Sequence, residues 1–242
     1  MDDVFEARLA GHPVRYAFRY PKTRLYFRSQ LKASDGAADI LASPEDIARA
    51  HALIPEQNAE DYAEFKALCA LTGRFLLRRY GCCIFHSVAL LYRGKAWLLT
   101  APSGTGKTTQ FMNWRKLLPS EITMISGDMP VLEQLDGEIT VHPSPWNGKE
   151  SIGSFLSAPL GGIVLLEQGQ ENRIEPLPVR EAIVSLIPQF VTTADTEAEI
   201  LTLCGLLEGL LHKPVWKLVN KGDLASTELL RETLRGGCDE TV

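Results

Sequence analysis

The chain of 242 residues is 45% hydrophobic, 23% charged and 8% aromatic, proportions that exclude collagen, coiled coil and intrinsic disorder. A chain of this length can bury one large core, or one core with a small lobe attached. With a formal net charge of −5, the chain lacks the strong positive field that binding to duplex DNA requires, so we expect no nucleic-acid partner.

The sequence also disfavours a membrane or secreted protein. The longest charge-free apolar stretch, residues 82–92, is too short to span a bilayer, and the first residues lack the basic and apolar regions of a signal peptide. We therefore expect a cytoplasmic protein with no membrane partner. The 5 cysteines include no C-x-x-C pair, which favours reduced thiols in the core over a disulfide framework or a zinc site.

The N-terminal part of the chain predicts a small strand-rich lobe. Residues 4–29 alternate apolar and polar side chains over short distances, which predicts two or three short strands. Ser43 then offers a capping hydroxyl and Pro44 a first-turn proline, so a short helix should follow. We assign residues 1–57 to this lobe and residues 58–242 to a kinase-like core, which together could form one continuous domain.

A longer helix and a hairpin come next. Apolar side chains recur at three- and four-residue steps over residues 59–79, which predicts an amphipathic helix that Gly81 ends. Two apolar strands follow, joined by a tight turn at Arg93 and Gly94. The second strand leads into a glycine-containing loop, after which a helix should begin at Lys107.

The segment after that helix indicates the architecture. Residues 122–126, 129–135 and 138–143 are three successive strand-like runs, and Asp136 with Gly137 forms a strong hairpin turn between the last two. Parallel neighbours need long crossovers, and no helix fits between these runs. We therefore predict an α/β fold of α+β character, with mixed, largely antiparallel sheets around a strand–loop–helix unit. The remaining predicted elements are a strand at 162–168, a short strand at 173–178, helices near 178–188 and 194–212, a strand at 214–220 and a helix at 224–234.

The glycine-containing loop carries the clearest chemical signal. Residues 101–108, A-P-S-G-T-G-K-T, match the phosphate-loop pattern G-x-x-x-x-G-K-[ST] except that alanine takes the first position. Glycines let successive N–H groups converge on phosphate oxygens, Lys107 would reach the β- and γ-phosphates, and the Thr108 hydroxyl would coordinate Mg²⁺. A glycine turn that only caps a helix requires neither this lysine nor this threonine. The residues predicted to bind ATP are Ser103, Gly104, Thr105, Gly106, Lys107, Thr108 and Thr109.

Three features resemble the HPr kinase and phosphoenolpyruvate carboxykinase family. They are the block F-H-S-V-A-L-L-Y-R-G-K-A-W-L-L-T at residues 85–100, the loop itself, and the strand end I-S-G-D that finishes at Asp128. His86 precedes Lys107 by the spacing that HPr kinases have between their histidine and loop lysine. The segment S-P-W-N-G-K at 144–149 is similar to small relatives of HPr kinase, including those found beside ribosomally made peptide pathways.

The resemblance implies a mixed α/β kinase fold and transfer of phosphate from ATP to a serine or threonine hydroxyl of a small protein or peptide. It also implies oligomers, so a homo-oligomer is compatible with it. In that family two adjacent aspartates divide metal binding and proton abstraction between them, whereas here Gly127 precedes a single Asp128. We expect Thr108 and Asp128 to hold Mg²⁺ and Asp128 to be catalytic, although an aspartate in a solvated turn is the alternative. The candidates for a second assisting carboxylate are Glu133, Glu150 and Glu167.

Two further side chains complete the predicted catalytic set. His86 would orient the nucleophile, contact a phosphate or bond Asp128, unless it is an ordinary strand histidine. Lys149 would steady the transferred phosphate, and Trp146 would stack on a base or peptide, unless both belong to an exposed structural loop. The residues expected to be structural are His142, Trp97, Trp114 and Trp216.

Three functions are therefore compatible with the sequence. The first is an HPr kinase-like serine or threonine kinase that uses ATP and Mg²⁺. The second is a nucleotide- and peptide-binding module with weak catalysis, which the missing second aspartate favours. The third is a small-molecule kinase, as the carboxykinase branch suggests, although the chain lacks a clear manganese-binding set.

Overall fold

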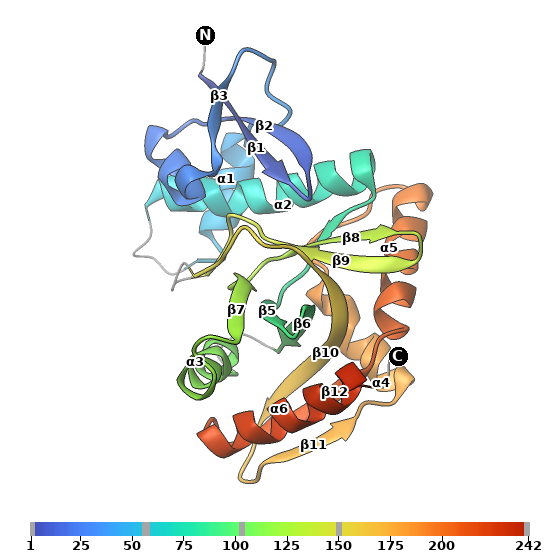
Figure 1. Cartoon of the computed structure of the whole chain (residues 1–242). Helices are drawn as coiled ribbons and strands as arrows, with labels where there is room; N and C mark the ends of the chain where they lie inside the picture. The colour runs from blue at the N-terminus through green and yellow to red at the C-terminus, as the bar shows by residue number, and fades with distance from the viewer. Residues whose placement is uncertain (1–2, 55–58, 102–104, 149–151, 240–242) are drawn as a thin grey trace.

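The computed structural model describes residues 3–54, 59–101, 105–148 and 152–239. In this part of the chain a three-stranded sheet packs on a long helix at one end, and a nine-stranded mixed sheet forms the rest of the scaffold (Figure 1). The fold is a mixed α/β one, as the sequence predicts. The predicted cysteine environment is confirmed for Cys69, Cys82 and Cys83, which are buried free thiols, whereas Cys204 is exposed.

The small sheet has the strand order β2-β1-β3. A turn at Ala10 and Gly11, both with positive φ, joins the first two strands. Residues 4–29 hold two strands, the lower of the two numbers predicted, because residues 21–30 form a 3-10 helix and the third strand follows it. Pro21 starts that helix, where its missing N–H removes no bond. The elements are β1 (Val4–Leu9), β2 (His12–Ala17), η1 (Pro21–Gln30) and β3 (Lys32–Ser34).

Two helices follow, α1 (Pro44–His51) and α2 (Glu60–Tyr80). Ser43 and Asp46 form a capping box at the start of α1, and Gly81, with a φ of 70°, ends α2. Leu68 and Leu76 of α2 share one buried cluster with the small sheet. The predicted domain boundary therefore falls between segments that share a core, and it stays a prediction.

The large sheet runs in the order β4-β8-β9-β10-β6-β5-β7, with β12 pairing β10 and β11. Strand β10 is parallel to β6 and to β12, and the other pairs are antiparallel. The predicted turns at Arg93–Gly94 and Asp136–Gly137 are both present, with positive φ at all four residues. The strands are β4 (Cys83–Ile84), β5 (Val88–Tyr92), β6 (Lys95–Thr100), β7 (Ile122–Ser126), β8 (Val131–Leu135), β9 (Glu138–His142), β10 (Ala158–Gln168), β11 (Arg173–Pro176) and β12 (Val215–Asn220).

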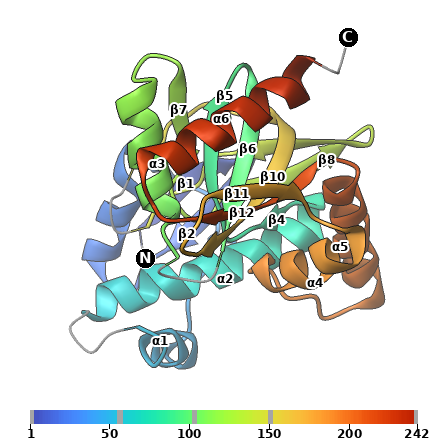
Figure 2. The same cartoon turned by 90° about the horizontal axis from the view of Figure 1, so that it is seen from below.

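Helices cover both faces of the central strands. Because side chains alternate along a strand, Leu99 of β6 packs with α3 (Lys107–Leu117) and α6 (Leu224–Asp239), whereas Leu98 packs with α4 (Val179–Leu186) and α5 (Glu197–Leu211). Figure 2 shows α3 and α6 side by side. Trp97 and Trp114 are fully buried, as predicted, and Trp216 is partly exposed. Within the described residues, every helix is either too short or too polar to cross a bilayer.

Candidate functional site

Three strand ends meet at one edge of the large sheet. Strand β5 is antiparallel to both β6 and β7, so its first residues lie beside the last residues of those two strands. The Thr100 hydroxyl at the end of β6 donates to the His86 carbonyl at 3.0 Å, and the Ser87 amide donates to the Asp128 carbonyl at 2.9 Å. The topology therefore brings His86, Asp128 and the end of the loop strand together.

The loop that follows β6 turns into α3 at Gly106. Its φ of 100° lies in a region that favours glycine, and it directs the first turn of α3 away from the strand. Lys107 is half-buried and its Nζ donates to the Ala101 carbonyl at 2.8 Å. Burial lowers the pKa of Lys107, and the Asp128 carboxylate acts in the opposite direction. Ser103 and Gly104 lie outside the described residues, whereas Thr105, Thr108 and Thr109 surround the start of the helix.

His86 and Asp128 form a close pair. The His86 Nε2 lies 3.4 Å from Asp128 Oδ1, and its Nδ1 lies 3.2 Å from the Gln189 Oε1. The Gln189 amide nitrogen donates to the Ser185 carbonyl, which leaves the amide oxygen facing the imidazole. The Gln189 Oε1 can therefore accept from the His86 Nδ1–H, and Nε2 is the ring nitrogen that faces Asp128.

Two buried hydroxyls next to this pair are unpaired. Within the described part of the chain, Ser87 Oγ and Ser126 Oγ have no hydrogen-bond partner. Buried polar atoms are nearly always paired, with solvent where protein atoms are lacking. Both hydroxyls belong to residues next to the strand ends that carry His86 and Asp128, where bound water could pair with them.

The segment around Asn147 closes over Gly127. The Asn147 Oδ1 accepts from the Gly127 amide at 3.0 Å, and the Asn147 amide nitrogen donates to the Ser144 carbonyl at 2.9 Å. Gly148 lies against Asp128, since a β-carbon there would be 3.4 Å from the Asp128 Cβ. The predicted Lys149 lies outside the described residues.

Trp146 has a different place from the one predicted. It is only 1% exposed, its indole N–H donates to the Phe65 carbonyl at 2.8 Å, and its ring stacks on that of Phe65. Burial leaves no face open for a base or a peptide, and it also rules out an exposed loop at this residue. Trp146 instead anchors the segment that leads to Asn147 on α2.

The candidate second carboxylates are paired elsewhere. Glu133 lies 2.9 Å from His12 Nε2 and 3.2 Å from His142 Nε2, and Glu167 lies 2.7 Å from Lys217 Nζ. Neither therefore assists Asp128, and Glu150 lies outside the described residues. The contacts of Gln189 and Asn147 with this site were not expected from the sequence, because both residues reach it only through long-range folding.

A pocket of about 450 Å³ adjoins the loop. Its walls come from the start of α3 and from the segments after β10 and β12, whose carboxyl ends lie together because these strands are parallel. The volume is within the range that small-molecule sites occupy. The residues that line it are Thr105, Gly106, Thr109, Gln168, Gly169, Gln170, Asn220, Lys221 and Gly222.

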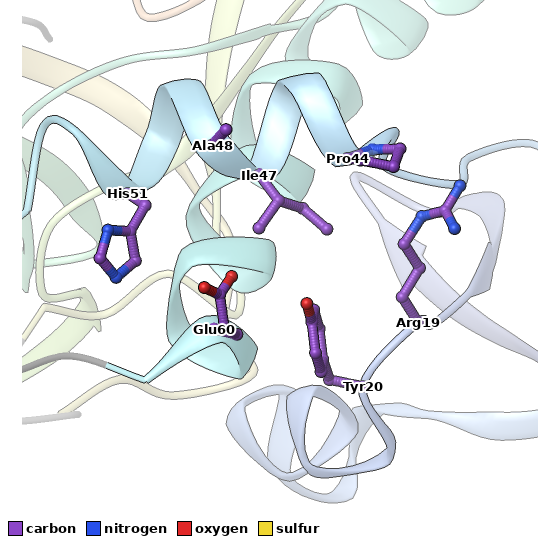
Figure 3. Close-up of a pocket in the computed structure, with 7 residues that line it drawn as sticks. All are labelled: Arg19, Tyr20, Pro44, Ile47, Ala48, His51 and Glu60. Atoms are coloured by element: carbon purple, nitrogen blue, oxygen red, sulfur yellow. The ribbon is translucent and has the colours of Figure 1, made fainter.

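A larger hollow of about 590 Å³ lies between the segment that leads into η1 and the helices α1 and α2 (Figure 3). Figure 3 shows Tyr20 and Glu60 on one side of it and Ile47 on the other. It contains none of the residues predicted to bind a nucleotide or to act in catalysis. The pocket beside the loop is therefore the better candidate for a ligand site.

Comparisons with known proteins give distant similarity to solved structures alone. No protein-family model matches the chain, and no curated protein matches it. Among solved structures, the chain is similar to the HPr(Ser) kinase/phosphatase from Coxiella burnetii, with 11% identity and a TM-score of 0.33 over 63% of this chain and 97% of that one. At this low similarity, only the residues of this chain itself can indicate its function.

Proposed function

We propose that this protein is an ATP- and Mg²⁺-dependent kinase of the HPr kinase type, which phosphorylates a serine or threonine hydroxyl of a small protein or peptide. The observation that carries the proposal is the pair of His86 and Asp128, 3.4 Å apart, at the strand ends beside Lys107 and the start of α3. Loop lysine, helix N-terminus and a carboxylate–imidazole pair are the parts that phosphoryl transfer needs.

The phosphates would lie on the amides of residues 103–108, with Lys107 at the β- and γ-phosphates. A polyphosphate beside Nζ would offset the effect of burial on the Lys107 ammonium. The nucleoside would then extend into the adjoining 450 Å³ pocket, which Gly106 and Thr109 reach from the loop side. The amide and carbonyl groups around Gln170 and Asn220 could hydrogen-bond a base there.

The residues present also fit a Mg²⁺ ion. The Thr108 hydroxyl and the Asp128 carboxylate are hard oxygen donors of the kind this cation prefers. When bound, the cation would neutralise charge on the transferring phosphate.

The His86–Asp128 pair would take the acceptor proton. The acceptor hydroxyl would lose its proton to Asp128 as its oxygen bonds the γ-phosphorus, and the bond from that phosphorus to the leaving ADP oxygen would break. The His86 Nε2 faces Asp128, so the imidazole could receive that proton and leave the carboxylate ionised. Lys149 would steady the transferred group.

The alternative is a module that binds nucleotide and peptide with little transfer. It is favoured by the packing at Gly127, where backbone atoms of Asn147 and Ile152 leave no space for a second acidic side chain. A homo-oligomer is compatible with either function.

The test uses purified protein, γ-labelled ATP, Mg²⁺ and candidate peptide acceptors. We expect Asp128→Asn to lower the transfer rate about 100- to 10,000-fold, the range of general-base contributions, with nucleotide affinity retained. The matched control is Asp136→Asn in the β8–β9 turn, which should transfer at the wild-type rate. Transfer that survives Asp128→Asn would contradict the kinase proposal, and nucleotide binding without transfer in the wild type would favour the module.

A further inference from the structure

A second cluster of reactive side chains lies away from the candidate kinase site. It joins His12, the first residue of β2, Cys82, between α2 and β4, and Glu133 of β8. The His12 Nε2 lies 2.9 Å and the Cys82 Sγ 3.8 Å from the Glu133 Oε1, and the three donor atoms are all within 4.8 Å of one another. In Figure 1 the small sheet lies above α2, and β8 and β9 lie below it.

A fourth side chain, His142 of β9, reaches the same carboxylate. Its Nε2 lies 3.2 Å from the Glu133 Oε2, within ion-pair distance, and is buried with no other partner among the described residues. Its Nδ1 bonds the Ser157 hydroxyl at 2.9 Å, which fixes the ring with Nε2 toward the cluster. If hydrogen bonds alone held these side chains together, the His142 Nε2 would stay unpaired. Leaving a buried polar atom unpaired lowers the free energy of unfolding, so native cores rarely do it.

The donor atoms match one kind of ligand. Imidazole nitrogen, thiolate sulfur and carboxylate oxygen together form the usual donor set of Zn²⁺. Tetrahedral bonds of about 2.0–2.3 Å place neighbouring ligand atoms roughly 3.3–3.8 Å apart. The Glu133 Oε1 lies 2.9 Å from the His12 Nε2 and 3.8 Å from the Cys82 Sγ, and the Glu133 Oε2 lies 3.2 Å from the His142 Nε2, all within a few tenths of an ångström of that range. The His142 Nε2 lies outside the group of three atoms that are within 4.8 Å of one another, so it would approach the ion from the Oε2 side.

The ligand rings are also held in place. His12 stacks on Tyr80 with ring centroids 4.0 Å apart and an angle of 8°, while Ser157 holds His142. Groups that fix the rings of metal-binding histidines raise affinity by keeping them oriented.

We propose that His12, Cys82 and Glu133, with Nε2 of His142 as the fourth ligand, bind one Zn²⁺ ion. The ion links the small sheet through His12 to β8 and β9 of the large sheet, so it is a structural staple rather than part of the kinase reaction. Spacing along the chain could not indicate the site, because the four ligands come from four separate segments and include a single cysteine.

The test is a titration of the chelator-treated, metal-free protein with Co²⁺, followed by displacement with Zn²⁺. We expect one Co²⁺ per chain, with tetrahedral visible bands and a sulfur-to-cobalt charge-transfer band that Zn²⁺ abolishes. Cys82→Ser should remove that band and weaken binding at least about 100-fold, since loss of supporting groups alone lowers affinity 10- to 100-fold. Cys204→Ser, which removes an exposed thiol, is the matched control and should bind like the wild type.

Stability gives a second readout. Zn²⁺ at about 100 times its dissociation constant should raise the melting temperature of the wild type by about 5–10 °C, and that of His12→Gln much less. His12→Gln is suited to the comparison because its partly exposed side chain makes misfolding a smaller risk than at Cys82. Absence of the charge-transfer band in the wild type, its persistence in Cys82→Ser, or an equal melting shift in His12→Gln would each overturn the proposal.

Discussion

Gly127 precedes Asp128, at the position where the resemblance to HPr kinases would place a second aspartate. A β-carbon on residue 127 would lie 2.5 Å from the carbonyl oxygen of Asn147 and 2.8 Å from that of Ile152. Both atoms belong to the backbone, so they cannot move aside as the end of a flexible side chain could. Replacement of Gly127 by alanine should therefore push the segment around Asn147 away from Asp128.

The size of the effect follows from overpacking. Extra atoms forced into a well-packed interior lower the free energy of unfolding by about 1–3 kcal/mol. For a chain of this length each kcal/mol corresponds to about 2–4 °C in melting temperature, so Gly127→Ala should melt roughly 2–12 °C below the wild type. Gly127→Asp should be destabilised at least as much, and it should not gain kinase activity.

Thermal and urea unfolding, followed by circular dichroism, measure the change. Gly236→Ala is the control, because a β-carbon there meets open space and alanine favours a helix by up to about 1 kcal/mol. If Gly127→Ala is as stable as the wild type, the packing argument for the missing aspartate is wrong.

Three other changes test the fold. Glu64→Gln should lower the free energy of unfolding by about 1–3 kcal/mol in urea titrations, because the buried carboxylate accepts from two backbone amides of residues 19 and 20, and equal stability would contradict this. Trp146→Phe should lose about 1–3 kcal/mol by the same measurement, because the Phe65 carbonyl would be left unpaired; a neutral result would show that the indole bond is unimportant. Hydrogen bonds from the Ser226 backbone amide, and then from the Asn172 side chain, lower the pKa of Asp223. The ionised carboxylate therefore stabilises the fold above about pH 4, and this stabilisation is lost as the pH falls through the folded pKa. Asp223→Asn should therefore flatten the acid side of the stability–pH curve, and an unchanged curve would count against this role.

Local signals account for the parts of the fold that the sequence predicts. The helix over residues 60–80 and its end at Gly81 follow from apolar periodicity and a positive φ, and the hairpin at Arg93–Gly94 follows from turn chemistry. The lack of helices between residues 122 and 142 is enough to exclude a doubly wound sheet. The 3-10 helix that begins at Pro21 was not predicted, since Glu64, far along the chain, accepts from the amides of residues 19 and 20 just before it and from the Thr23 hydroxyl within it.

The candidate site divides in the same way. Lys107, Asp128 and His86 are recognisable because a motif and its spacing lie within one segment, and the antiparallel strands then bring the last two within 3.4 Å. The burial of Trp146 was not predictable, because it depends on a bond to Phe65 in α2. The grouping of Glu133 with His12 likewise depends on how the small sheet packs against the large one.

The measurement that tests the central claim most directly is a calorimetric titration of the protein with ATP in the presence of Mg²⁺. We expect one nucleotide per chain, bound about 10- to 100-fold more weakly by Lys107→Ala, because a hydrogen bond to a charged group contributes about 1.5–3 kcal/mol. Lys116→Ala, at the exposed end of the same helix, should bind like the wild type. No binding heat in the wild type, or equal affinity in Lys107→Ala, would contradict the nucleotide site and with it the proposed kinase.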